Sequence, residues 1–224
     1  MKFRHEYKHY INRSDYFILK TRLENIMEPD RNVNPEGKYM IRSLYFDNLY
    51  DKALREKIDG VNNREKFRFR YYNDDTSFIR LEKKSKINNL CNKQSVRVTS
   101  EQVKRIIDGD YEWMSNCEEK LVLELYSKIK GQLLLPKTIV EYIREPYTME
   151  AGNVRITIDS EIKTGILNTD FLNRNAYMVS TNNDTMILEV KYDNFLPDII
   201  KNIITLETRR SSAFSKYAIS RIYG

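Results

Sequence analysis

The chain has 224 residues, 41% hydrophobic and 31% charged, and its 38 Lys and Arg against 32 Asp and Glu give a net charge of +6. This composition can bury a core, whereas only 7 Gly and 5 Pro argue against long flexible linkers. Two cysteines exclude a disulfide framework and a cysteine-rich zinc site, and no apolar run approaches the roughly 20 residues of a membrane helix. The N-terminus is too charged for a signal peptide, so we expect a cytoplasmic protein with an acidic partner.

The first part of the chain is predicted to alternate between strands and helices. Side chains of opposite character alternate with a period of two over 2–11 and 39–47, which predicts two strands. Ser14 is a good N-cap for a helix over 15–27, and a short helix is expected over 49–58.

The rest of the chain continues this mixture. Strands are predicted over 92–98, 137–147, 153–162 and 185–193, and helices over 101–108, 115–130, 198–208 and 213–223. Ser100, Pro197 and Ser212 are predicted to begin three of these helices, and Gly109 and Gly131 to end two.

The strongest pattern is a basic hairpin from Arg64 to Lys86, which reverses at Asn73–Thr76. One parity of its two runs holds Arg64, Lys66, Arg68, Arg70, Arg80, Glu82, Lys84 and Lys86. One face would therefore carry seven cations and a single carboxylate. Because like charges on neighbouring strands repel, a polyanion between them would offset the repulsion.

The other predicted strands also have one ionic face and one apolar face. The helices must cover the apolar faces, because together they would form too large an apolar patch. This predicts a single α+β domain. The ionic faces could lie on the outside of a curved sheet or inside a closed barrel, which removes edge strands and encloses a small ligand. A cationic interior with a few carboxylates suits a polyphosphate and a divalent metal.

Short motifs along almost the whole chain carry a family resemblance. They are R-H-E-Y-K at 4–8, S-L-Y-F-D at 43–47, K-F-R-F-R at 66–70, L-E-K-K at 81–84, E-Y-I-R at 141–144, V-R-I-T-I-D at 154–159, L-E-V-K at 188–191 and F-S-K at 214–216. In this order they resemble the polyphosphate-polymerase domains of the vacuolar transporter chaperone (VTC) type, in the triphosphate tunnel metalloenzyme superfamily. The resemblance implies one VTC-like domain over residues 1–224, folded as a closed antiparallel eight-stranded β-barrel with helices outside.

The resemblance also implies roles for individual residues. Those expected to bind phosphate are Lys8, Lys66, Arg68, Arg70, Lys84, Lys93, Arg144, Arg155, Lys191 and Lys216. Among them, the catalytic set is Arg68, Arg70, Arg144 and Lys216. Arg97 is an alternative to Lys93. Glu189, Glu6 and Glu82 are expected to hold Mn²⁺ or Mg²⁺, whereas Ser43, Tyr45 and Asp47 are expected to make structural hydrogen bonds.

The implied function is transfer of the terminal phosphate of ATP to a polyphosphate chain. The simpler triphosphatase and cyclase members begin with Glu-x-Glu-x-Lys, whereas this chain has Arg4 at the first Glu position, which favours the polymerase branch. The alternatives are a hydrolase of inorganic triphosphate or polyphosphate, and a non-catalytic polyphosphate- or nucleotide-binding module. Family members often work beside membrane-spanning segments, so a membrane-associated partner protein is expected.

A nucleic-acid module is the main rival outside this family. Aromatic residues mostly occupy the parity opposite the cations, whereas an RNA-binding sheet presents both on one face. We therefore expect no nucleic-acid partner. No glycine-rich phosphate loop is present, so ATP would be held through its phosphates by the basic side chains.

Overall fold

The computed structural model describes residues 4–87, 90–181, 184, 186–205 and 215–222. The chain divides into two compact units. The first unit comprises Met1–Met40, Tyr142–Ile162 and Asn182–Phe214, and the second comprises Ile41–Glu141, Lys163–Thr181 and Ser215–Gly224. The single domain expected over residues 1–224 stays a prediction.

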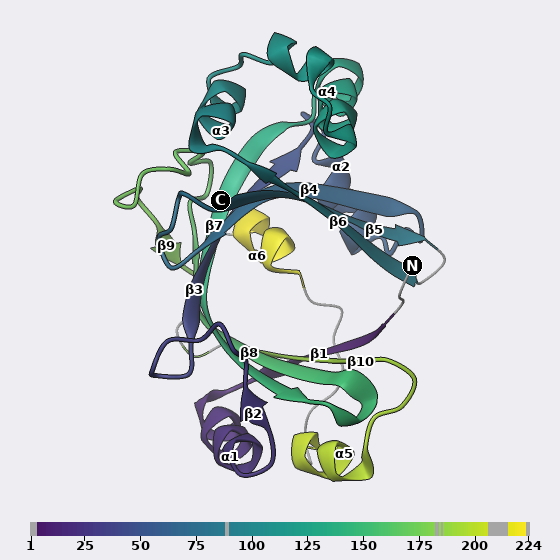
Figure 1. Cartoon of the computed structure of the whole chain (residues 1–224), viewed down its shortest axis with the longest axis vertical. Coiled ribbons are helices and arrows are strands. Elements are labelled where there is room, and N and C mark those ends of the chain that lie inside the picture. Colours follow the sequence, from purple (N-terminus) through teal and green to yellow (C-terminus); the bar gives the residue numbers. More distant parts are fainter. Residues whose placement is uncertain (1–3, 88–89, 182–183, 185, 206–214, 223–224) are drawn as a thin grey trace. The chain divides into compact units, whose positions relative to one another are not determined.

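The strands are hydrogen-bonded to one another in a defined order (Figure 1). From one edge to the other they are β1 (His5–Ile11), β10 (Met186–Tyr192), β8 (Val154–Thr164), β7 (Leu135–Met149), β3 (Tyr39–Asp47), β4 (Arg64–Tyr72), β5 (Ile79–Ile87) and β6 (Leu90–Val98). Two short strands, β2 (Glu28–Pro29) and β9 (Val179–Ser180), pair with β7 and β8. The sheet is antiparallel, as expected.

The two end strands of this order, β1 and β6, leave the sheet open. Within the described residues, β1 pairs with β10 and β6 pairs with β5, and neither has a second neighbour. The prediction of a closed eight-stranded barrel was therefore wrong, whereas the α+β class is confirmed. Alternation along each strand reports the face of a side chain. Whether edge strands pair depends on tilt and stagger, which alternation does not encode.

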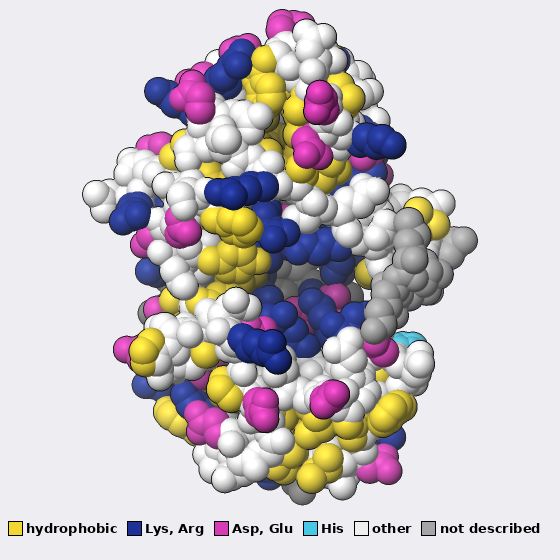
Figure 2. All heavy atoms as spheres, in the orientation of Figure 1, with side chains coloured by type: hydrophobic (Ala, Val, Ile, Leu, Met, Phe, Trp, Pro, Cys, Tyr) yellow, Lys and Arg dark blue, Asp and Glu magenta, His cyan; other side chains and the backbone are white. Residues whose placement is uncertain are grey.

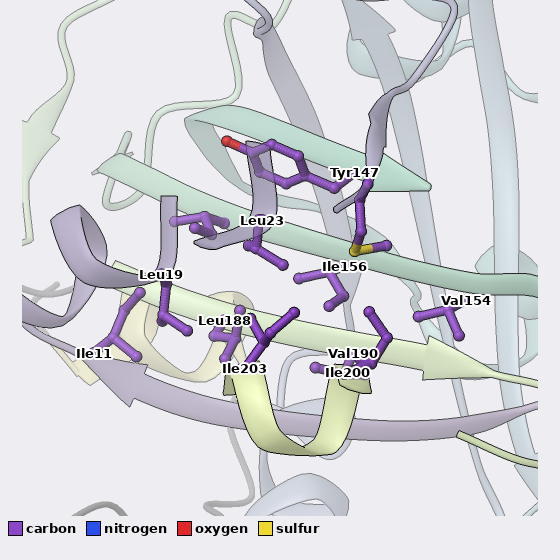
Figure 3. Close-up of a cluster of buried hydrophobic side chains, with 12 residues drawn as sticks. Ile11, Leu19, Leu23, Tyr147, Val154, Ile156, Leu188, Val190, Ile200 and Ile203 are labelled. Atoms are coloured by element: carbon purple, nitrogen blue, oxygen red, sulfur yellow. The ribbon is translucent and has the colours of Figure 1, made fainter. Parts of the chain in front are cut away.

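The core of the first unit lies between its sheet and two helices, α1 (Arg13–Glu24) and α5 (Asp198–Ile204). Figure 3 shows Leu19 and Leu23 of α1 and Ile200 of α5 in one cluster with Ile156 and Val190 of the strands. All five are fully buried. Burial of each such side chain contributes about 1.5–3 kcal/mol, so this cluster fixes the apolar face of β8 and β10 and leaves their ionic face opposite.

Helix α1 begins two residues earlier than predicted. Asn12, rather than Ser14, is its N-cap, and the Asn12 Oδ1 accepts a hydrogen bond of 2.8 Å from the backbone N–H of Asp15. The Asp15 carboxylate accepts a bond of 3.0 Å from the Asn12 N–H in return. This capping box satisfies two N–H groups that a Ser14 cap would have left unpaired.

The second unit packs helices against the strands β3 to β6. They are α2 (Lys52–Ile58), α3 (Ser100–Ile107), the 3₁₀ turn η1 (Glu112–Asn116), α4 (Lys120–Gln132) and α6 (Lys216–Ile222). The aromatic rings of Phe46 and Phe69 meet edge to face, with centroids 5.2 Å apart, and α4 buries Leu125 and Ile129. Another 3₁₀ turn, η2 (Ala151–Asn153), belongs to the first unit.

Several predicted helix ends moved by a residue or more. Thr99, rather than Ser100, caps α3, and α4 runs past Gly131 to end where Leu133 turns left-handed, with φ of 52°. Gly109 follows α3 with φ of 85°, as expected of a terminating glycine. The Ser212 cap lies outside the described residues. None of the described helices combines the length and the apolar character needed to cross a membrane.

Candidate functional site

In the first unit, Lys8 binds two of the predicted carboxylates. Its Nζ lies 2.9 Å from Glu6 Oε1 and 3.2 Å from Glu189 Oε1. Lys8 and Glu189 are direct cross-strand partners on β1 and β10. Glu6 faces Lys191 in the same way, two residues away along each strand. Burial opposes the charge on Lys8, but attraction to Glu189 and Glu6 outweighs burial and raises its pKa. Lys8 is therefore a permanent cation.

Arg144 completes this first-unit cluster. Its guanidinium binds Asp159 through two bonds, Nε to Oδ1 at 2.6 Å and Nη2 to Oδ2 at 2.8 Å, and Asp159 is fully buried. The same Nη2 lies 3.5 Å from Glu189, and Lys191 Nζ lies 3.3 Å from it. The first-unit cluster, defined as Glu6, Lys8, Arg144, Asp159, Glu189 and Lys191, thus balances three cations against three carboxylates.

Arg155 lies on the same face of β8 but has other partners. It faces Lys191 across the strands, and its Nη2 lies 3.0 Å from Asp30 and donates a bond of 3.1 Å to Tyr39. The prediction that Arg155 binds phosphate is untested. A phosphate at this position would have to compete with Asp30.

In the second unit, three predicted cations share one carboxylate. Arg68 donates from Nε to Glu82 Oε2 at 2.8 Å, and Arg70 Nη1 lies 3.9 Å from the same oxygen. Lys93 pairs with the other oxygen. Glu82 is only 1% exposed, and although burial would raise its pKa, the charges of Arg68 and Arg70 outweigh burial and hold that pKa well below its usual range. Because these three cations share one carboxylate, the second-unit cluster of Arg68, Arg70, Glu82 and Lys93 keeps an excess of positive charge.

The chain matches one family model over residues 3–222, that of the VTC domain. The chain belongs to the VTC domain family. The resemblance drawn from the motifs is therefore confirmed over nearly the whole sequence. No curated protein sequence matches the chain.

Three solved structures are similar to the chain at low sequence identity. A Bacillus halodurans protein described as an adenylate cyclase candidate matches with a TM-score of 0.51 at 9% identity, covering 85% of this chain and 80% of that one. Two Pyrococcus horikoshii proteins, PH1012 and PH1819, each have a TM-score of 0.46, at 14% and 13% identity. Their matches cover 90% and 96% of this chain and 85% and 97% of theirs. The likeness to the first shows the fold alone.

Tyr45 of the VTC domain contacts the second-unit cluster more closely than predicted. Its hydroxyl accepts a bond of 3.0 Å from Arg68 Nη1. Burial would raise the pKa of Tyr45, but the charges of Arg68 and Arg70 outweigh burial and lower it to about 8. Ser43 accepts from Arg70 at 3.0 Å. Both residues make the hydrogen bonds expected of them. That these bonds orient Arg68 and Arg70 follows from the pairing of β3 with β4, which the sequence alone does not show.

Lys66 connects β4 of the VTC domain to the start of α6. Its Nζ donates to Ser215 Oγ at 3.1 Å and lies 5.1 Å from the centroid of the Tyr217 ring. Burial lowers the pKa of Lys66 to about 8. The contact brings Lys216, the residue after Ser215, to the same part of the unit. Asp47, expected to be structural, accepts bonds from the Tyr217 hydroxyl and from the backbone of Ala53.

The remaining predicted cations follow the strand register. Lys84 faces Lys66 on one side and Lys93 on the other, so three lysines form a row across β4, β5 and β6. Figure 2 shows Lys and Arg side chains gathered over these strands of the second unit. Lys93 already pairs with Glu82, and a bound anion would further reduce the repulsion among the three lysines.

Proposed function

We propose that this VTC domain is a phosphotransferase that moves the terminal phosphate of ATP onto a polyphosphate chain. The observation that carries the proposal is the second-unit cluster, in which Arg68, Arg70 and Lys93 share the single carboxylate of Glu82. Guanidinium groups bind phosphate oxygens bidentately, and the excess positive charge suits a polyanion. Membership of the VTC family supports polyphosphate as that polyanion.

The chemistry requires alignment and charge stabilisation and no side-chain nucleophile. A terminal oxygen of the polyphosphate attacks the γ-phosphorus of ATP, the bond from that phosphorus to the β-phosphate bridge breaks, and ADP leaves. The residues for which we propose catalytic roles, as the resemblance implies, are Arg68, Arg70, Arg144 and Lys216. The others would hold the chain: Lys8, Lys66, Lys84, Lys93, Arg155 and Lys191.

A divalent ion, Mn²⁺ or Mg²⁺, is part of the proposal. Among the described residues, no group of three or more His, Cys, Asp or Glu is arranged to hold a metal. Glu6 and Glu189 are nevertheless near each other, since both contact Lys8 within 3.2 Å. Mg²⁺ often takes one or two carboxylates and completes its shell with phosphates and water, so this pair fits an ion that arrives with the nucleotide. Bound there, the ion would neutralise phosphate charge.

Glu82 fits a metal less well than the other two carboxylates. Both of its oxygens already contact cations, and the side chain is almost completely buried. We therefore propose that Glu82 mainly orients Arg68 and Lys93. We also expect action in the cytoplasm beside a membrane-associated partner protein, as the resemblance implies.

The test is incubation with ATP and Mn²⁺, followed by measurement of polyphosphate chain length. Arg70→Ala and Glu189→Gln should each abolish chain growth, whereas Arg105→Gln on α3 should leave it unchanged. Release of orthophosphate alone would support the hydrolase, and tight triphosphate binding without turnover with either metal would support the binding module.

A further inference from the structure

Arg80 and Arg97 of the second unit face each other on β5 and β6, and Arg80 also faces Arg70 on β4. Three arginines therefore stand in register across three strands. Within the described residues, neither Arg80 nor Arg97 forms an ion pair with a carboxylate. The carboxylate of Asp75 interacts electrostatically with Arg97. The pKa of Asp75 is lowered mainly by hydrogen bonds from Ser77, and the charge of Arg97 contributes less. Such a row is unfavourable without an anion.

Phe78 holds the two guanidinium groups together. Its ring centroid lies 4.9 Å from Arg80 Cζ and 5.1 Å from Arg97 Cζ. Arg80 donates one bond to Ser95 Oγ at 3.3 Å, and Arg97 donates one to the Ser77 carbonyl at 3.1 Å. Because a guanidinium has five N–H donors, most donors of this pair remain for a ligand. The Arg80–Phe78–Arg97 cluster is thus ordered in advance of binding.

This cluster lies directly beside the second-unit cluster, because Arg80 faces Arg70 across the strands. Arg70 donates to Ser43 on β3 and lies near Glu82, whereas Arg80 donates to Ser95 on β6, the strand on the other side of β5. Ser95 is the cross-strand partner of Glu82. Along the strands, the row that contains Arg80 is four residues from the row of Lys66, Lys84 and Lys93, a separation of about 13 Å. An anion that covers both rows must be an extended one.

We propose that the Arg80–Phe78–Arg97 cluster binds phosphates of a long polyphosphate chain that lie beyond the triphosphate held by the second-unit cluster. This inference rests on the proposed function. Two guanidiniums already cover the Phe78 ring, which argues against a stacking platform for a nucleic-acid base. The cluster therefore recognises repeated phosphate charge, and it should distinguish long chains from short ones.

The experiment compares binding of tripolyphosphate, long-chain polyphosphate and single-stranded DNA by the full chain. The test variant is Arg80→Gln with Arg97→Gln. The control, Arg105→Gln with Lys130→Gln, removes the same charge from α3 and α4. We expect the test variant to bind long-chain polyphosphate at least about tenfold more weakly than wild type. The slope of its affinity against salt concentration should decrease by the equivalent of about two phosphate contacts. Its affinity for tripolyphosphate should stay within about twofold of wild type. Arg80→Lys with Arg97→Lys should recover part of the loss.

Each other outcome overturns a defined part of the proposal. An equal loss for tripolyphosphate would place both arginines in the triphosphate site, and an equal loss in the control would reduce the effect to net charge. An equal loss for DNA would make the cluster a general anion surface. Unchanged binding of long-chain polyphosphate by a folded test variant would show that the cluster does not bind it. A wild-type chain that binds no polyphosphate would contradict the proposed function itself.

Discussion

Arg68 and Glu82 face each other on β4 and β5, and the guanidinium places both Nε and Nη2 on one carboxylate oxygen, at 2.8 and 2.7 Å. Arg70 approaches the same oxygen, and Lys93 takes the other. This buried carboxylate is therefore the element that lets three cations occupy neighbouring strands before any substrate is present.

Glu82→Gln should lower the free energy of unfolding by about 3 kcal/mol, because it leaves partly buried cations uncompensated. A bound polyanion would replace the missing negative charge. Tripolyphosphate should therefore raise the melting temperature more in the variant than in wild type. Glu112→Gln removes an exposed carboxylate paired with Lys130 and should leave stability close to that of wild type. Calorimetry with and without ligand checks both. An equal ligand-induced shift in Glu82→Gln and wild type would contradict the idea.

The arrangement of this cluster was partly visible in the sequence. Alternation from Arg64 to Lys86 correctly placed Arg68, Arg70 and Glu82 on one face. It could not show which cation would contact which carboxylate, since that depends on register across strands. The bidentate pairing of Arg144 with Asp159, which are 15 residues apart, is of this kind.

Other features depended on local geometry that residue type describes poorly. Asn12 and Ser14 are both good caps, and only the path of the chain after β1 selects Asn12. The prediction of a closed sheet was wrong for a related reason, because closure would require β1 to pair with β6, and the tilt and stagger of all the strands decide whether it does. Residue patterns therefore predicted faces well and edges badly.

Gly152 should tolerate substitution less well than Gly60. It has φ of 71°, and a Cβ there would lie 2.5 Å from the Phe195 carbonyl oxygen. Gly60 has the same φ of 71° but no atom within 4 Å of such a Cβ. Gly60→Ala should therefore cost about 1 kcal/mol for the backbone alone, and Gly152→Ala about 2 kcal/mol more. Urea unfolding measures both, and equal costs would refute the steric argument.

Thr157 should be a position where removal of a hydroxyl group increases stability. It faces Glu189 across β8 and β10, it is 3% exposed, and its hydroxyl has no hydrogen-bond partner among the described residues. An unpaired buried hydroxyl costs stability, so Thr157→Val, which keeps the shape, should raise the free energy of unfolding by about 1 kcal/mol. Thr164→Val is the control. Thr164 is also buried, but its hydroxyl accepts from Ile166 N at 3.0 Å, so that variant should lose stability. A loss in both variants would show that Thr157 is satisfied.

Stability should rise with pH above neutrality because of Lys66 and Tyr45. Burial lowers the pKa of Lys66 from 10.5 to about 8, and the charge of Arg68, working against burial, lowers that of Tyr45 from 10.0 to about 8. In the folded protein both groups lose their proton near pH 8, whereas the unfolded chain keeps both protons until about pH 10. The unfolded state thus binds more protons between these values, and the free energy of unfolding increases with pH there.

Lys66→Met and Tyr45→Phe should each remove part of this increase, on the order of 2 kcal/mol per group between about pH 8 and pH 10. Lys104→Met, an exposed position on α3, should leave the pH dependence of stability as in wild type.

Phosphate binding should respond to pH in the opposite direction, since a neutral Lys66 attracts no anion. Tripolyphosphate affinity should therefore fall as pH rises through about 8 in wild type, and this fall should be smaller in Lys66→Met. Urea unfolding and titration calorimetry over this range measure the two trends, and a wild-type stability that declines from pH 8 to pH 9 would contradict the assignment.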